Sequence, residues 1–132
     1  MAAMNSGQVS VKVIVVDDQA PFRRAMSDVV AATEGFELVA AAESAAAAEA
    51  VVEQQTPDLL FIDVRMPDEY GPVLAQRIRT RYPTVVIVLC SSYARHDVAP
   101  EIFDQGIAFL AKEDVTPDSI VALWRELHPD AA

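Results

Sequence analysis

Polar side chains that could do chemistry together follow four short apolar runs of the sequence. In chain order they are Asp17 and Asp18, Asp63, Ser91, and Lys112. Three carboxylates close together repel one another, and a hard cation such as Mg²⁺, which prefers oxygen ligands, can hold them ionised. A central aspartate can then attack phosphorus as a nucleophile, while a lysine and a hydroxyl offset the charge of the transferred group. These residue types predict a phosphoryl-transfer site with Asp63 at its centre.

The segments that must position these residues alternate between strand-like and helix-like patterns. Four of the strand-like runs are short, mostly β-branched or aromatic, and do not alternate with polar residues, which is typical of strands buried on both faces. A fifth run, Phe36–Ala41, follows Gly35 and shows this pattern less clearly. In chain order the five runs are Val11–Val16, Phe36–Ala41, Leu59–Ile62, Val85–Cys90 and Ile107–Ala111. Helices are predicted between them, with Pro21 in a first turn and Ser44 and Thr116 as N-caps. Their ranges are Phe22–Ala32, Ser44–Gln55, Val73–Tyr82, Val98–Asp104 and Asp118–Leu127.

This alternation predicts one α/β domain, a doubly wound (βα)5 fold with a parallel five-stranded sheet. We expect the domain over residues 9–128, with a flexible tail at 1–8 and a second tail at 129–132. If the strand order is 2-1-3-4-5, it reverses between the first and third strands, and open α/β sheets bind ligands at the carboxyl ends of strands at such a point. The three carboxylates would converge there, whereas the second strand ends in alanines.

The composition limits the class of protein. The chain has 132 residues, of which 52% are hydrophobic, so one compact domain with a sizeable core is expected. A formal net charge of -10 repels polyanions and argues against direct nucleic-acid binding. No segment approaches the roughly 18 apolar residues that span a bilayer, and the start of the chain does not resemble a secretory signal. We therefore expect a cytoplasmic protein without membrane contact, with its only cysteine, Cys90, in the core.

Over nearly its whole length the chain resembles the receiver domains of response regulators in bacterial two-component signalling. The matching segments are Val-Val-Asp-Asp at 15–18, Phe-Ile-Asp-Val-Arg-Met-Pro-Asp-Glu-Tyr-Gly at 61–71, Val-Leu-Cys-Ser-Ser at 88–92 and Gly-Ile-Ala-Phe-Leu-Ala-Lys at 106–112. An acidic pair alone is a weak signal, but an Asp-x-x-Met-Pro-x-x-x-Gly loop with a later lysine is a strong one. The resemblance implies a flavodoxin-like fold and a signalling switch whose only reactions are its own phosphorylation and autodephosphorylation.

The resemblance also implies how the acidic residues divide their roles. Asp63 is the expected phosphoacceptor and a ligand of Mg²⁺. Asp18 is expected to bind the ion directly, Asp17 partly through water, and Arg65 through its main-chain carbonyl. The Arg65 and Tyr93 side chains, each two residues beyond a site residue, are expected to shield the aspartyl phosphate from water and set its lifetime.

The remaining matched positions imply a switch. Lys112 is expected to pair with the phosphoryl group, and Ser91 to supply the hydroxyl that moves toward it. Phe109 stands at the position of the aromatic residue that turns inward as the hydroxyl moves, although it could also be an ordinary core residue.

The partners follow from the same resemblance. A sensor histidine kinase or a phosphotransfer protein is the expected phosphoryl donor. Glu113 follows the lysine where many receivers have proline, as in the subfamily that usually carries a helix-turn-helix output domain. The face of the fourth and fifth predicted helices, with Phe109 beside it and Trp124 nearby, is the expected partner or homodimer surface. His96 and His128 are expected at the surface without a phosphotransfer role.

Three other functions fit the sequence less well. A receiver-like adaptor would bind its partner without phosphorylation, and the complete acidic, serine and lysine set argues against it. A hydrolase that uses an aspartyl phosphate carries a second aspartate two residues after the nucleophile, where this chain has Arg65. A nucleotide-binding protein of this class needs a glycine-rich loop, which the sequence lacks. The last predicted helix ends near the C-terminus, so we expect either a stand-alone receiver or a fragment of a longer DNA-binding regulator.

Overall fold

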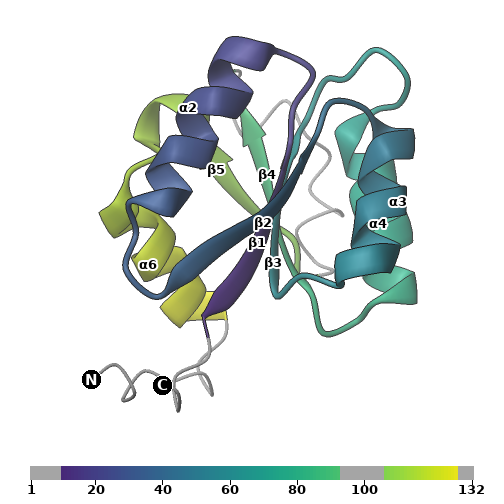
Figure 1. Ribbon diagram of the computed structural model, residues 1–132. Helices are drawn as coiled ribbons and strands as arrows, with labels where there is room; N and C mark the ends of the chain where they lie inside the picture. Colours follow the sequence, from purple (N-terminus) through teal and green to yellow (C-terminus); the bar gives the residue numbers. More distant parts are fainter. Residues whose placement is uncertain (1–9, 93–105, 128–132) are drawn as a thin grey trace.

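A computed structural model describes residues 10–92 and 106–127 of the chain (Figure 1). The predicted tails, the predicted helix Val98–Asp104, and the residues Tyr93, His96 and His128 lie outside the described residues. The elements within them are β1 (Val11–Val16), α2 (Ala20–Ala31), β2 (Phe36–Ala42), α3 (Ala45–Gln55), β3 (Leu59–Asp63), α4 (Gly71–Arg81), β4 (Val86–Ser91), β5 (Ala108–Ala111), the 3-10 turn η2 (Lys112–Asp114) and α6 (Pro117–Leu127).

The strands form one parallel sheet in the order β2-β1-β3-β4-β5, which confirms the predicted topology. Helices α2 and α6 cover one face of the sheet, and α3 and α4 cover the other (Figure 1). Strands β3 and β4 are buried at every residue, as their uninterrupted apolar sequences predicted. The order reverses between β1 and β3, so the carboxyl ends of these two strands form the predicted binding edge. None of the described helices is long and apolar enough to cross a membrane.

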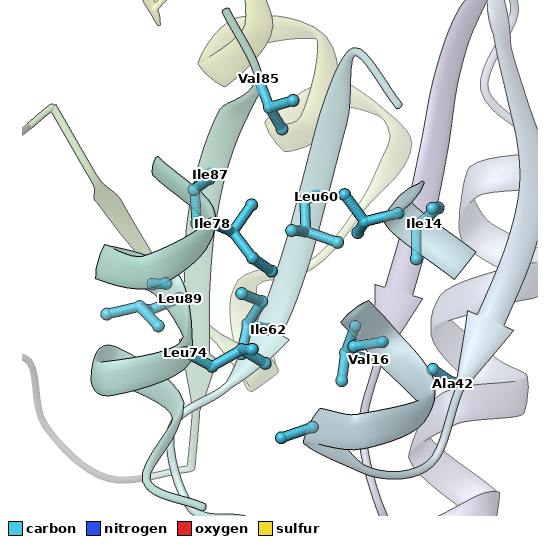
Figure 2. Packing of buried hydrophobic residues seen from close by; sticks show 14 of the residues in the cluster. Ile14, Val16, Ala42, Leu60, Ile62, Leu74, Ile78, Val85, Ile87 and Leu89 are labelled. Carbon is cyan, nitrogen blue, oxygen red and sulfur yellow. The ribbon is translucent and has the colours of Figure 1, made fainter. Parts of the chain in front are cut away.

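Alternate residues of each strand supply two hydrophobic clusters, one on each face of the sheet. Leu60 and Ile62 of β3 belong to the cluster under α3 and α4, together with Leu74 and Ile78 of α4 (Figure 2). Leu59 and Phe61, their neighbours in β3, belong to the cluster under α2 and α6. Because successive side chains of a strand point to opposite faces, one strand fills both layers.

Two residues of uncertain role in the sequence have clear places in this core. Cys90 is 2% exposed in β4, as predicted, and burial raises the pKa of its thiol. Trp124 of α6, expected near a partner surface, is 9% exposed, and its ring packs edge-on against Phe36 at 6.3 Å between centroids. It belongs to the α2/α6 cluster, whereas Phe109 packs against the α3/α4 cluster, so the sheet separates the two rings. Trp124 was expected near the partner surface, and the structure buries its indole in the α2/α6 cluster, where it contributes to the core.

The first residues of the helices test the N-caps and helix starts that the sequence predicted. The Ser44 hydroxyl accepts a hydrogen bond from the Ala47 N–H at 3.1 Å, and the Thr116 hydroxyl accepts one from the Ser119 N–H at 3.0 Å, so both predicted N-caps are confirmed. Helices α2 and α4 begin two residues earlier than predicted, at Ala20 and Gly71. In each case a proline stands second in the helix, where its missing N–H costs no intrahelical hydrogen bond.

Shortening a core side chain of β3 tests this packing. Leu60 is fully buried, so Leu60→Ala removes apolar contacts within the α3/α4 cluster and leaves a cavity. We expect the free energy of unfolding to fall by about 2–5 kcal/mol in urea titrations followed by circular dichroism. Val73→Ala is the matched control, because Val73 is 45% exposed and its loss should change stability by less than about 0.5 kcal/mol. Equal effects of the two substitutions would contradict the described core.

Candidate functional site

The predicted site residues meet at the carboxyl edge of the sheet. Asp17 directly follows β1, Asp63 ends β3, Ser91 ends β4 and Lys112 directly follows β5. A cleft of about 170 Å³ opens there, lined by Gln19, Asp63, Arg65, Ser91, Ser92 and Lys112. Four strands of one parallel sheet thus bring together side chains that are far apart in the sequence.

The ammonium group of Lys112 lies between two buried carboxylates. Its Nζ is 2.8 Å from Asp17 Oδ2 and 3.4 Å from Asp63 Oδ1. The side chains of Asp17 and Asp63 are 1% and 6% exposed, and that of Lys112 is 11% exposed. Burial lowers the pKa of Lys112, but the close contact with the Asp17 carboxylate and the charge of Asp63 more than offset this and leave the pKa above its ordinary value.

The carboxyl group of Asp63 is tuned by opposing effects. Burial, followed by the neighbouring charge of Asp17, raises its pKa to about 6 from an ordinary value of 3.8. The charge and hydrogen bond of Lys112 and the main-chain N–H of Arg65 act in the opposite direction. Asp63 therefore binds a proton far more readily than an exposed aspartate, yet most molecules carry it ionised at neutral pH.

The acidic cluster has the composition of a site for a hard cation. Carboxylate oxygens of Asp17, Asp18 and Asp63 lie within 4.8 Å of one another, and Asp18 is the most exposed of the three. Asp17 Oδ1 accepts a hydrogen bond from the Gln19 N–H at 2.8 Å. Asp17 Oδ2 is buried and, despite the nearby ammonium of Lys112, accepts no well-directed hydrogen bond from any residue that the structure describes. Mg²⁺ prefers oxygen ligands, so three carboxylates, one of which has a buried oxygen without a well-directed hydrogen bond from the described residues, suit this ion.

The first turn of α2 fixes the main chain at Asp17. A guanidinium N–H of Arg23 donates to the Asp17 carbonyl at 2.7 Å, and the same side chain lies 3.8 Å from Glu43 beyond β2. The Asp17 N–H donates to the Ala42 carbonyl at 3.0 Å. This contact of Arg23 was not predicted from the sequence. An arginine one helical turn after an acidic pair is the signal that could have indicated it.

The loop between β3 and α4 folds back on Asp63 because residue 71 is glycine. The Gly71 N–H donates to the Val64 carbonyl at 2.7 Å, and Arg65 and Tyr70 form an antiparallel bridge across the loop. A Cβ atom at Gly71 would collide with the main-chain oxygen of Asp63 and would lie 2.9 Å from the Cα of Val64. The glycine in the Asp-x-x-Met-Pro-x-x-x-Gly segment is therefore required by close main-chain packing under the candidate phosphoacceptor.

Charged side chains anchor the same loop to both neighbouring helices. The Asp68 carboxylate accepts hydrogen bonds from the Ala45 N–H at 3.0 Å and from the next main-chain N–H at the start of α3, which lowers the pKa of Asp68. Arg77 of α4 binds Glu69 of the loop at 2.6 Å and Glu49 of α3 at 2.9 Å. Neither the capping of α3 by Asp68 nor the ion pairs of Arg77 were predicted, because the residues that form these contacts are distant in sequence.

The two predicted switch residues lie on adjacent strands. Ser91 is 2% exposed and lines the cleft from the end of β4. Phe109 of β5 is paired with Leu89 of β4 and packs against the α3/α4 cluster, half-buried and away from the α2/α6 layer. The structure thus places the hydroxyl at the cleft and the ring on the α3/α4 side of the sheet.

Comparison with known proteins gives one family. A family model described as the response regulator receiver domain matches residues 13–125. The response regulator protein FleR of Pseudomonas aeruginosa is 38% identical over 100 residues, which cover 76% of this chain and 21% of FleR. A protein-glutamate methylesterase/protein-glutamine glutaminase of Anaeromyxobacter dehalogenans is 36% identical over 90 residues, which cover 68% of this chain and 26% of that protein. This chain therefore spans only about a quarter of the length of these two relatives.

The fold is also found among solved structures. The signal receiver domain of the response regulator NarL from Mycobacterium tuberculosis has a TM-score of 0.79 and 27% sequence identity to this chain. The similarity covers 89% of this chain and 95% of the NarL domain.

Substituting the glycine of the loop tests the main-chain packing under Asp63. Gly71→Ala inserts a methyl group against the main chain of β3, and overpacking of this kind costs about 1–3 kcal/mol. We expect that loss in the free energy of unfolding, together with shifted amide resonances at residues 63–65 in ¹⁵N NMR spectra. Thr80→Ala, at an exposed position of the same helix, is the control and should leave both unchanged. Unperturbed resonances at residues 63–65 in Gly71→Ala would contradict the described loop.

The raised pKa of Asp63 predicts a pH-dependent effect of Asp63→Asn on stability. The folded protein binds this proton with a pKa of about 6 and the unfolded chain with one near 3.8, so ionising Asp63 destabilises the fold as pH rises from about 4 to 6. The asparagine variant does not ionise. We expect it to be more stable than the parent chain by about 2–3 kcal/mol at pH 7.5 and nearly equal to it at pH 4. Urea unfolding in the presence of EDTA measures the difference, and a gain that does not change with pH would refute the assignment.

Proposed function

The chain belongs to the family of response regulator receiver domains, and on this premise we propose that it is a phosphorylation switch that accepts a phosphoryl group on Asp63. The observation that carries the proposal is the ammonium of Lys112, which lies 2.8 Å from Asp17 and 3.4 Å from Asp63 beside a cleft. A nucleophile, a countercharge and a group of oxygen ligands are thereby assembled at one edge of the sheet. The proposed donor is the phosphohistidine of a sensor histidine kinase or of a phosphotransfer protein.

The reaction needs little more than correct placement of these groups. A carboxylate oxygen of Asp63 attacks the phosphorus atom, the O–P bond forms as the N–P bond to the donor histidine breaks, and the imidazole nitrogen keeps the electron pair of that bond. With a pKa of about 6, Asp63 is mostly ionised at neutral pH and can act as the nucleophile. The ammonium of Lys112 offsets the charge of the transferred group, and the hydroxyl of Ser91 donates a hydrogen bond to it.

Mg²⁺ is the proposed cofactor of this transfer. Asp17, Asp18, Asp63 and the main-chain carbonyl of Arg65 would hold it, and the shared position of the three carboxylates supports this ligand set. When bound, the ion would neutralise negative charge on the phosphoryl group. Arg23 and the Gln19 N–H keep Asp17 in place for that role.

The proposed output is a change of partner contacts next to β4 and β5. Ser91 moves toward the phosphoryl group, and Phe109 turns inward on the adjacent strand, whose pairing with β4 joins the two residues. The proposed site for an output partner or for a second copy of the chain is the face that the sequence assigned to the fourth and fifth predicted helices, of which the structure describes only the latter, α6. The similarity to NarL agrees with the subfamily expected from Glu113, in which the receiver controls a helix-turn-helix domain.

Transfer to Asp63 is tested by intact mass after incubation with acetyl phosphate and Mg²⁺. We expect a gain of one phosphoryl group that disappears on omitting Mg²⁺, on adding EDTA, and in Asp63→Asn. Asp28→Asn removes the same charge at an exposed position of α2 and should leave the gain intact.

If no gain occurs in a folded sample, a purified histidine kinase with ATP replaces acetyl phosphate as the donor. Failure with both donors would reject the switch and favour an adaptor that binds without phosphorylation.

A further inference from the structure

The ammonium of Lys112 has a third neighbour that the proposed chemistry does not use. It lies over the ring of Phe22, with Nζ 4.4 Å from the ring centroid. Phe22 belongs to the first turn of α2, is half-buried, and packs against the α2/α6 cluster. The ring therefore joins the hydrophobic layer to the charged group at the edge of the sheet.

The face of an aromatic ring carries partial negative charge and attracts an ammonium group. It offers no strong hydrogen-bond acceptor, so it attracts the cation without competing for the N–H donors that reach Asp17 and Asp63. A lysine has a flexible four-carbon stem and loses rotamer freedom when its end is fixed. A ring that covers one side of the ammonium reduces the number of positions that it can occupy, and it does so without a further negative charge in an already acidic site.

We propose that Phe22 is a positioning residue for Lys112, an inference that rests on the proposed phosphoryl transfer. Its ring holds the ammonium beside the two carboxylates, where it is ready to offset the charge of the incoming group. The next residue, Arg23, holds the other member of the ion pair, because its guanidinium donates to the main-chain carbonyl of Asp17 at 2.7 Å. One helical turn thereby places both the acidic residue and its countercharge.

The alternative is that Phe22 is only a core residue, and paired substitutions separate the two roles. Phe22→Leu keeps apolar bulk and removes the ring, whereas Phe22→Tyr keeps the ring. Phe22→Met is a second ringless variant, used if Phe22→Leu does not fold. Phe36→Leu is the matched control, because Phe36 packs in the same cluster against Trp124 and its ring contact is with that indole.

The first measurement reports the contact without any phosphoryl transfer. The chain has two lysines, Lys12 and Lys112, so ¹³C-labelled lysine gives two ε-methylene signals, and Lys12 serves as an internal reference. The ring over Lys112 should shift its ε-protons upfield. We expect this shift in the parent chain, in Phe22→Tyr and in Phe36→Leu, and its loss in Phe22→Leu. No upfield shift in the parent chain would overturn the contact itself.

The second measurement is the rate of phosphorylation by acetyl phosphate at saturating Mg²⁺. We expect Phe22→Leu or Phe22→Met to slow it about threefold to tenfold, which equals roughly 0.6–1.4 kcal/mol, and Phe22→Tyr and Phe36→Leu to stay within twofold. Equal slowing by Phe22→Tyr and Phe22→Leu, or none in either ringless variant, would reduce Phe22 to a core residue. If the parent chain is not phosphorylated while the upfield shift is present, the proposed function fails and the contact stands.

Discussion

A single ammonium group between two buried carboxylates is the interaction on which the functional edge of this protein depends. Asp17 and Asp63 end neighbouring strands, and without Lys112 their charges would repel across a region from which water is largely excluded. Lys112 follows β5, which lies at the far edge of the sheet. Its contact with the two carboxylates therefore forms only when β3, β4 and β5 pair in the described register. The hydrophobic layers thus do more than stabilise the chain, because they determine whether the charges are balanced.

The outer helices hold the charged residues in place through their main chain. Arg23 binds the carbonyl of Asp17, and the close approach at Gly71 fixes the chain under Asp63. The loop beyond Asp63 is tied to α3 by Asp68 and to α4 by Glu69. Exposed ion pairs such as that of Glu69 each contribute little to the free energy of folding. These contacts matter for function because they restrict the loop that carries Arg65, the residue proposed to contribute a ligand oxygen and a shielding side chain.

How much of this could be predicted from the sequence depended on how local each signal was. The uninterrupted apolar run of Leu59–Ile62 identified a strand buried on both faces, and Ser44 identified a helix start, because each signal lies within one element. The position of Lys112 at the same edge as Asp17 needed the strand order, which the alternation of elements does not determine and which was therefore a condition of the prediction. The bridge from Arg77 to Glu49 and the burial of Trp124 against Phe36 depend on how helices pack against other parts of the chain, and no local pattern encodes that. The ring of Phe22 over Lys112 is of the same kind.

The charge balance of the site explains why its parts suit a switch rather than a static ion pair. Three carboxylates and one ammonium leave an excess of two negative charges when all are ionised. That excess is visible in Asp63, whose pKa is raised by burial and by Asp17 in spite of the lysine. A fully balanced cluster would have no electrostatic reason to accept a divalent ion, whereas the excess negative charge of this one would be offset by the Mg²⁺ proposed for the site. Adding or removing a phosphoryl group at the proposed acceptor would therefore change the forces on Ser91 and Lys112, which lie at the ends of β4 and β5, the strand that carries Phe109.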